Sequence, residues 1–272
     1  MIPPGIHSAT TILTFCLVWI RVSSVRRVIQ MHSSTASSSG IKTSISGPSG
    51  DKTLYIVRHG TTEMNEALGR QPWGSRDFKD QLLWDTVLTT ASGDKSGVAQ
   101  AKRLNDRLKK MILPEEIQAI VSSPLTRTLQ TAELVFQGFP TETPRVVCPL
   151  ARERLYLSSD VGECKTVLMD RFPAWDFSQI PNDDPWWFTV SDSTPYVEWR
   201  PSGEYGCPGE PREVFRERIR ALHGWLAQRP ERTIALVTHW GVARGLTGES
   251  LHNCELKKCT LSSLLLEPKI DH

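Results

Sequence analysis

Short apolar runs alternate with amphipathic segments along the chain from Lys52 onward. The apolar runs predict buried strands at Thr53–Val57, Gln118–Ser123, Thr233–His239 and Leu261–Glu267. Between the strands, apolar residues recur at helical spacing in two sets: Ala101, Leu104, Leu108 and Ile112, then Phe215, Ile219, Leu222 and Leu226. This alternation predicts an α/β fold in which helices cover both faces of a mainly parallel sheet.

Residues 156–210 interrupt the alternation of strand and helix. This segment is rich in proline, glycine and acidic residues, and it holds four tryptophans: Trp175, Trp186, Trp187 and Trp199. Loop-rich insertions on a rigid sheet often form lids and substrate walls, which favours a lid-like insertion over an edge of the sheet. The alternative is that the tryptophans pack a small core of the insertion itself.

The first 50 residues differ from the rest of the chain. The apolar run at 11–20 is too short for a membrane span, which needs about 20 residues, and its arginines follow it, unlike those of a secretory signal. A serine-rich stretch without acids comes next, as in organelle transit peptides. We therefore divide the chain into a disordered leader at 1–50, a candidate chloroplast or mitochondrial transit peptide, and a catalytic domain at 51–272. The alternatives are a plain disordered tail or a start at Met31, and either would favour a cytoplasmic protein.

Composition narrows the function classes. The 272 residues are 39% hydrophobic and 23% charged, as in ordinary soluble domains. The formal charge is +2, and residues 1–50 carry four basic residues and no acid, so residues 51–272 sum to −2. A nearly neutral body argues against nucleic-acid binding. The six cysteines lack Cys-x-x-Cys or zinc-type spacing, which predicts reduced thiols and no metal site.

Polar side chains follow three of the predicted strands at their carboxyl ends. Arg58 and His59 end the first strand, Arg127 follows the second, and His239 ends the third. In open parallel sheets, ligands bind beyond this edge. Arginine presents a planar set of donors that suits phosphate oxygens, and Arg127 lies in the first turn of a predicted helix, where anions are also favoured. The pattern therefore predicts a phosphate site.

The neighbouring arginines should also affect the protonation of the histidines. The neighbouring cations disfavour protonation, so one histidine should stay neutral and able to attack phosphorus through a phosphohistidine. Such a reaction also needs a general acid for the leaving oxygen. Glu153, after a short apolar run, is the candidate, with Asp160 or Glu163 as alternatives. Glu153 could instead form a surface salt bridge with Arg152 or Arg154.

Five segments together resemble the histidine phosphatase superfamily, the phosphoglycerate mutase-like group. They occur in the family's order over about Lys52 to Glu267: "VRHGTTEMN", "SSPLTRTLQTA", "LARE", "GEPREVFRERI" and "VTHWG". The resemblance implies a three-layer α/β/α sandwich with the site at the carboxyl edge of the sheet. It also implies that no metal and no organic cofactor is needed.

The resemblance assigns roles to individual residues. His59 would be the phosphorylated nucleophile, and Glu153 would be the proton donor that later accepts a proton from water. His239 would belong to the catalytic set and, like Arg58 and Arg127, bind the phosphate. The set is completed by weaker candidates for contacts to phosphate or substrate: Asn65 and either Thr62 or Thr61.

Two departures from the family pattern favour a phosphatase over a mutase. Thr61 stands where glycolytic mutases usually have glutamate, and "ERLYL" replaces their Glu-Arg-His-Tyr-Gly element. We therefore expect hydrolysis, and the resemblance implies a small phosphorylated metabolite as the substrate, with a phosphoprotein as the alternative. A phosphoglycerate-type mutase and a non-catalytic sensor of a phosphorylated ligand are the alternatives. The sequence does not indicate an oligomeric state.

Overall fold

The structure, a computed structural model, describes residues 51–72, 75, 77, 83–90, 93–182, 186–187 and 209–270. The predicted leader at 1–50 and residues 183–185 and 188–208 of the predicted insertion lie outside the described residues. The strands are β1 (Thr53–Arg58), β2 (Ala119–Ser122), β3 (Arg145–Val147), β4 (Thr233–Thr238) and β5 (Leu256–Thr260). The α-helices are α1 (Glu63–Leu68), α3 (Gly97–Met111), α4 (Thr126–Val135), α5 (Lys165–Arg171), α6 (Arg212–Gln228) and α7 (Trp240–Thr247). Short 3₁₀ turns lie at Pro114–Glu116, Pro149–Ala151, Ser158–Asp160 and Leu261–Ser263.

The five strands form one mixed sheet in the order β3-β2-β4-β1-β5. β1 and β2 both pair in parallel with β4, β2 also pairs in parallel with β3, and β5 alone is antiparallel. The predicted mainly parallel sheet is confirmed. The predicted strand at Leu261–Glu267 is wrong, because the edge strand β5 ends at Thr260 and a 3₁₀ turn follows. Leu264 instead packs into the core.

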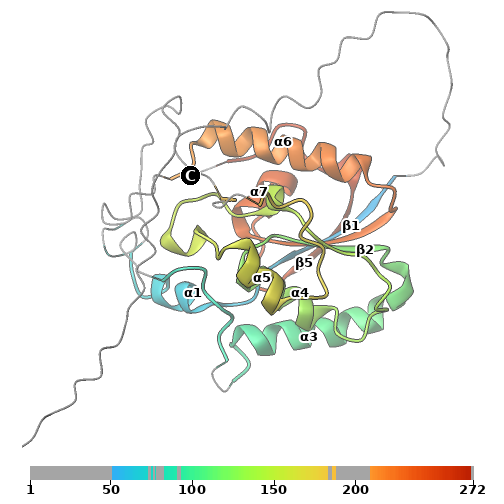
Figure 1. The fold of residues 1–272 in the computed structure, drawn as a ribbon, viewed down its shortest axis with the longest axis horizontal. Helices are drawn as coiled ribbons and strands as arrows, with labels where there is room; N and C mark the ends of the chain where they lie inside the picture. The colour runs from blue at the N-terminus through green and yellow to red at the C-terminus, as the bar shows by residue number, and fades with distance from the viewer. Residues whose placement is uncertain are drawn as a thin grey trace, which may run out of the picture. The chain divides into compact units, whose positions relative to one another are not determined.

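Helices cover both faces of this sheet, as Figure 1 shows for α6 and α7 on one side and α3 and α4 on the other. Alternate residues of β1 divide between the two cores: Tyr55 and Val57 pack with α3 and α4, and Leu54 and Ile56 pack with α6 and α7. Burying a large apolar side chain contributes roughly 1.5–3 kcal/mol. The three-layer sandwich therefore follows from strands that are apolar on both faces.

The described part of the predicted insertion joins one of these cores. Trp175 and Trp186 are buried in the same cluster as residues of α3 and α4, and Trp187 packs against it. In this part of the chain the tryptophans therefore do not form a separate core.

The register brings the polar strand ends together. Arg58 lies opposite Thr238, and Ser122 lies opposite Val237, so β1, β4 and β2 end side by side. Because β4 lies between β1 and β2, His239 is placed between the residues that follow the other two strands. The fold itself thus gathers side chains that are up to 181 positions apart in the sequence.

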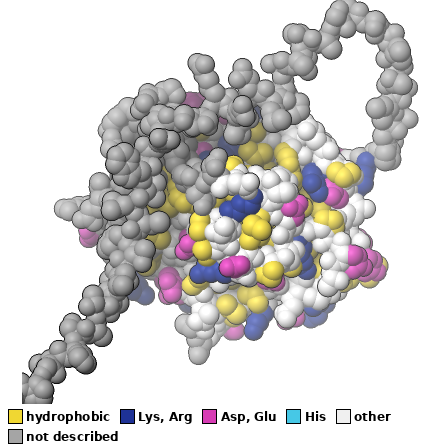
Figure 2. Space-filling view, viewed as in Figure 1, with side chains coloured by type: hydrophobic (Ala, Val, Ile, Leu, Met, Phe, Trp, Pro, Cys, Tyr) yellow, Lys and Arg dark blue, Asp and Glu magenta, His cyan; other side chains and the backbone are white. Residues whose placement is uncertain are grey.

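Charged side chains of both signs are mixed on the described surface. Figure 2 shows basic and acidic side chains interspersed on the described surface that faces the viewer, in keeping with a nearly neutral body. Among the helices of the described ranges, none has both the length and the apolar character that a membrane crossing requires.

Candidate active site

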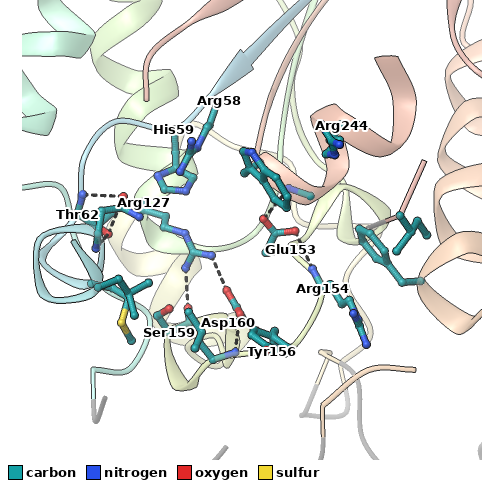
Figure 3. Close-up of a pocket in the computed structure, with 18 of the residues that line it drawn as sticks. Arg58, His59, Thr62, Arg127, Glu153, Arg154, Tyr156, Ser159, Asp160 and Arg244 are labelled. Carbon is teal, nitrogen blue, oxygen red and sulfur yellow. Dashed lines mark hydrogen bonds and ion pairs between the residues drawn. The ribbon is translucent and has the colours of Figure 1, made fainter. Parts of the chain in front are cut away.

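A cavity of about 550 Å³ opens at the carboxyl edge of the sheet. Figure 3 shows it with side chains from β1, from the start of α4 and from the segment after β3 pointing toward one another. Six of the seven predicted site residues line the cavity: Arg58, His59, Thr62, Asn65, Arg127 and Glu153. The seventh, His239, is not among the lining residues, but its ring centroid is 5.2 Å from that of His59.

His59 is held as a neutral ring with one nitrogen free of a proton. Its Nδ1 lies 2.7 Å from the carbonyl oxygen of Gly60. A carbonyl only accepts hydrogen bonds, so the single proton of the neutral ring belongs on Nδ1 and Nε2 keeps its lone pair. Burial, followed by the charges of Arg127 and Arg58, lowers the pKa of His59 well below its usual 6.5. The geometry suits a nucleophile.

His239 is fully buried and has one nitrogen without a partner. Its Nε2 lies 2.7 Å from the hydroxyl oxygen of Ser123, which also accepts from the amide of Leu125. Its Nδ1 is buried and finds no hydrogen-bond partner among the described residues. If the hydroxyl of Ser123 donates to Nε2, the ring proton lies on Nδ1 and is available to an anion. Burial, and then Arg127 and His59, lowers the pKa of His239 well below 6.5.

Arg58 and Arg127 are both anchored by carbonyl oxygens. Arg58 donates from Nη1 to Leu251 at 2.8 Å, and its buried Nε has no partner within the described part of the chain. Arg127 donates to the carbonyl of Ser159 at 2.6 Å and to Asp160 Oδ1 at 2.9 Å. These contacts hold two guanidinium groups at one cavity, and unpaired buried donors such as Arg58 Nε are the groups that an oxyanion would satisfy.

Glu153 is half-buried in the cavity and does not behave as a surface ion-pair partner. Its carboxylate accepts from the backbone amides of Gly241 at 3.0 Å and Arg154 at 2.9 Å. Burial, followed by the charge of Asp160, raises the pKa of Glu153. Arg152, one of its suggested surface partners, instead pairs with the buried Glu210.

The two alternative acids are placed differently. Asp160 lines the cavity, but its carboxylate is bound to Arg127 and to the amides of Tyr156 and Leu157. Glu163 is not among the residues that line the cavity. The geometry therefore favours Glu153 as the acid.

Thr62 and Asn65 line the cavity and also cap the N-terminus of α1. The Thr62 hydroxyl accepts from the Asn65 amide at 3.2 Å, and the Asn65 side chain accepts from the Thr62 amide at 3.1 Å, which caps α1. Thr61 hydrogen-bonds to Gln100 and does not line the cavity. Of the two threonines, Thr62 is thus the one positioned for a ligand.

Sequence reasoning missed a buried ion cluster that supports the Glu153 segment. Glu210, fully buried, pairs with Arg152 at 3.1 Å and with Arg218 at 2.7 Å. Arg218 also donates to the carbonyl oxygens of Arg152 and Glu153. The sequence did contain a sign of this cluster: helical spacing puts the charged Arg218 on the same apolar face of α6 as Phe215.

The described ranges contain no cluster of side chains suited to hold a metal ion. There, no three His, Cys, Asp or Glu side chains are grouped as metal ligands, and Cys148, Cys164, Cys254 and Cys259 are free thiols. Cys16 and Cys207 lie outside the described residues.

Comparison with known proteins places the chain among phosphate-transferring enzymes. The family model described as the histidine phosphatase superfamily (branch 1) matches residues 54–266. A phosphoglycerate mutase-like protein of Arabidopsis thaliana is 26% identical over 255 residues, covering 79% of this chain and 84% of that protein. A Schizosaccharomyces pombe protein named "Probable phosphatase" is 28% identical over 191 residues, covering 70% and 74%. The solved mycobacterial glucosyl-3-phosphoglycerate phosphatase aligns with a TM-score of 0.43 at 22% identity, over 76% of this chain and 92% of that one.

Proposed function

The chain belongs to the histidine phosphatase superfamily, and from that premise we propose that it hydrolyses small phosphomonoesters through a phosphohistidine on His59. One observation carries the proposal: in a single cavity the pKa of His59 is lowered and the pKa of Glu153 is raised. Environments that shift two titratable groups in opposite directions are typical of a base or nucleophile and its acid.

The first step forms the phosphohistidine. His59 Nε2 attacks phosphorus, the ester P–O bond breaks, and the proton of Glu153 passes to the leaving oxygen, so that an alcohol departs. Arg58, Arg127 and the Nδ1–H of His239 stabilise the phosphoryl oxygens, where the charge is spread in the transition state. This use satisfies Arg58 Nε and His239 Nδ1, which lack partners among the described residues.

The second step returns the enzyme to its first state. Water attacks the phosphohistidine, and the carboxylate of Glu153 takes a proton from that water. The P–N bond breaks, inorganic phosphate is formed, and His59 is again neutral. Glu153 can serve both steps because burial raises the pKa of its carboxyl group while that group still lines the cavity.

Hydrolysis is favoured over phosphoryl transfer to a second hydroxyl. Thr61 replaces the glutamate typical of mutases, and its side chain binds Gln100 outside the cavity. Leu155 replaces the histidine of the mutase element and is buried. Neither residue contributes a polar group to the cavity lining, where it could retain and reorient an intermediate.

The test is trapping of the covalent intermediate. The protein is incubated briefly with a ³²P-labelled aryl phosphate, denatured in alkali, which preserves phosphohistidine, and mapped by peptide. We expect label on His59 and release of inorganic phosphate. His59→Asn should abolish both, whereas the matched control His223→Asn, on α6 and outside the cavity lining, should retain both.

The alternatives give different results in the same experiment. Label on His59 with an isomerised ester in place of inorganic phosphate would identify a mutase. Tight binding of the ester without label or phosphate release would identify a phosphate-ligand sensor. Wild-type turnover by His59→Asn would refute the covalent mechanism.

A further inference from the structure

The cavity extends beyond Glu153, and several of its lining residues have no part in binding the phosphate. The cavity lining also holds aromatic side chains, Tyr156 and Trp240 among them, and three cations: Arg154, Arg244 and Lys269. The acids among the described lining residues are Glu153 and Asp160, and both belong to the phosphate end. In Figure 3, Arg154 and Arg244 lie across Glu153 from Arg58 and His59. The far end is therefore apolar and positively charged.

Helix α7 sets the spacing between the two ends. His239 precedes its first residue, Trp240 opens it, and Arg244 follows one turn later. Five residues of helix rise by about 7.5 Å along the axis, and in Figure 3 Arg244 lies apart from Arg58, His59 and Arg127. Trp240 and Arg244 are four residues apart and lie on one side of the helix, with 5.6 Å between the guanidinium carbon and the ring centroid.

Both arginines are fixed against aromatic rings. Arg244 donates to Ser250 Oγ at 3.0 Å while it lies over Trp240. Arg154 donates to the carbonyl of Glu210 at 2.7 Å, and its guanidinium carbon is 5.9 Å from the centre of Tyr156. Guanidinium groups held in this way lose little entropy on binding a carboxylate or phosphate. The rings offer flat apolar surface to the body of a ligand.

The size of the cavity also exceeds the needs of a simple phosphate group. At about 550 Å³ it falls within the range typical of sites for organic ligands. The aromatic rings offer apolar surface and the three cations attract an anion, which a neutral ester body with many hydroxyl groups would not supply. The lining is better matched by an aromatic ring that bears an acidic group.

We propose that the substrate is a phosphomonoester whose organic part is aromatic or otherwise apolar and carries a second oxyanion at the end opposite the phosphate. The phosphate binds at Arg58 and Arg127, the apolar body lies along Trp240 and Tyr156, and the second oxyanion meets Arg244. This inference rests on the proposed phosphatase function and gives its substrate class.

The test compares two esters that differ in one charge: 4-(carboxymethyl)phenyl phosphate and 4-(carbamoylmethyl)phenyl phosphate. The methylene group insulates the ring, so the two phenols are similar leaving groups. We expect kcat/KM to be about tenfold higher for the carboxylate ester, as one charge-assisted contact would give. Arg244→Gln should reduce this ratio to near one. Arg107→Gln, an exposed residue of α3 with the same change of charge, should leave the ratio as in the wild type.

The same pair separates failure of this inference from failure of the proposed function. Turnover of both esters at equal kcat/KM, or a ratio that Arg244→Gln does not change, would overturn the second-oxyanion site and leave the phosphatase intact. If neither ester is hydrolysed, the phosphatase proposal fails for these esters, and the charge preference is read from calorimetric Kd values with His59→Asn. A tenfold preference there would support the site, and equal Kd values would overturn it.

Discussion

Gly241 lies so close to Glu153 that a side chain at position 241 would displace the Glu153 carboxylate. Its amide donates to Glu153 Oε2 at 3.0 Å, and a β-carbon on Gly241 would stand 2.4 Å from Glu153 Oε1. Such a separation is far below contact distance for carbon and oxygen. The absence of a side chain at the first turn of α7 is therefore what lets the amide orient the carboxyl group.

Gly241→Ala should displace the carboxyl group of Glu153 and lower kcat on an unactivated ester by about 10- to 100-fold, a part of what a positioned general acid contributes. Gly224→Ala, where a β-carbon meets nothing within 4 Å, is the matched control in α6. The control should keep wild-type kcat and gain about 0.5–1 kcal/mol in free energy of unfolding. Steady-state kinetics and denaturant unfolding of both variants test this; full activity of Gly241→Ala would contradict it.

Glu153→Gln should slow the enzyme according to the leaving group. An acid matters most where the departing oxygen is strongly basic, so phenyl phosphate should lose about 10²- to 10⁴-fold in kcat/KM. With 4-nitrophenyl phosphate, whose leaving group needs little protonation, the loss should be much smaller. Equal losses on the two esters would mean that Glu153 binds or positions the substrate and does not donate the proton.

The pH profile of kcat/KM should be bell-shaped. The rate rises with pH as His59 loses its proton, and its lowered pKa puts this limb well below pH 6.5. The rate falls as Glu153 loses its proton, and its raised pKa puts that limb above pH 4.5. A stopped assay across the acidic and neutral range, with phenyl phosphate, measures both limbs.

Asp160→Asn tests whether the ionisation of Glu153 causes the fall in rate at the alkaline limb of the profile. After burial, the charge of Asp160 is the second cause of the raised pKa of Glu153, so its removal should move this limb to lower pH. Asp160 is not among the groups that shift the pKa of His59, and the acid limb should stay in place. Ionisation of the substrate is common to both enzymes and cancels in the comparison. An alkaline limb that does not move would assign it to another group.

The ion cluster around Glu210 should make stability depend on pH. Burial alone would raise the pKa of Glu210, but Arg152 and Arg218 lower it from 4.5 to about 2. A folded-state pKa below the unfolded value stabilises the fold above about pH 4.5, and this contribution of about 3 kcal/mol is lost as the pH falls toward 2.

Glu210→Gln tests that contribution directly. At pH 7 the variant should lose about 3–5 kcal/mol in free energy of unfolding, because two buried guanidinium groups lose their counter-charge. The difference from wild type should shrink by about 2 kcal/mol at pH 3. Glu217→Gln, exposed on the same helix, should stay within about 0.5 kcal/mol at both values. A difference that is constant with pH would assign the titration to other carboxyl groups.

The sequence alone determined the layers of this protein and the kinds of group at its site. Strands β1, β2 and β4 are short apolar runs, and α3 and α6 carry apolar residues at helical spacing, so local periodicity was sufficient to find them. β5 was not found, because "LKKCT" is an edge strand with one paired neighbour and an exposed Lys258, whereas the more apolar "LSSLLLE" beside it forms a turn.

Only the tertiary structure decided how the site's groups meet. Gly241 lies 88 positions from Glu153, and His239 lies 116 positions from Ser123, yet each pair is in hydrogen-bonding contact. These contacts depend on the placement of β4 between β1 and β2, which no local pattern encodes. The pKa values of His59 and Glu153 depend on burial and on charges brought from other strands. The sequence thus shows which residue types form the site. The protonation and orientation of these residues, and the cationic far end of the cavity, depend on tertiary packing.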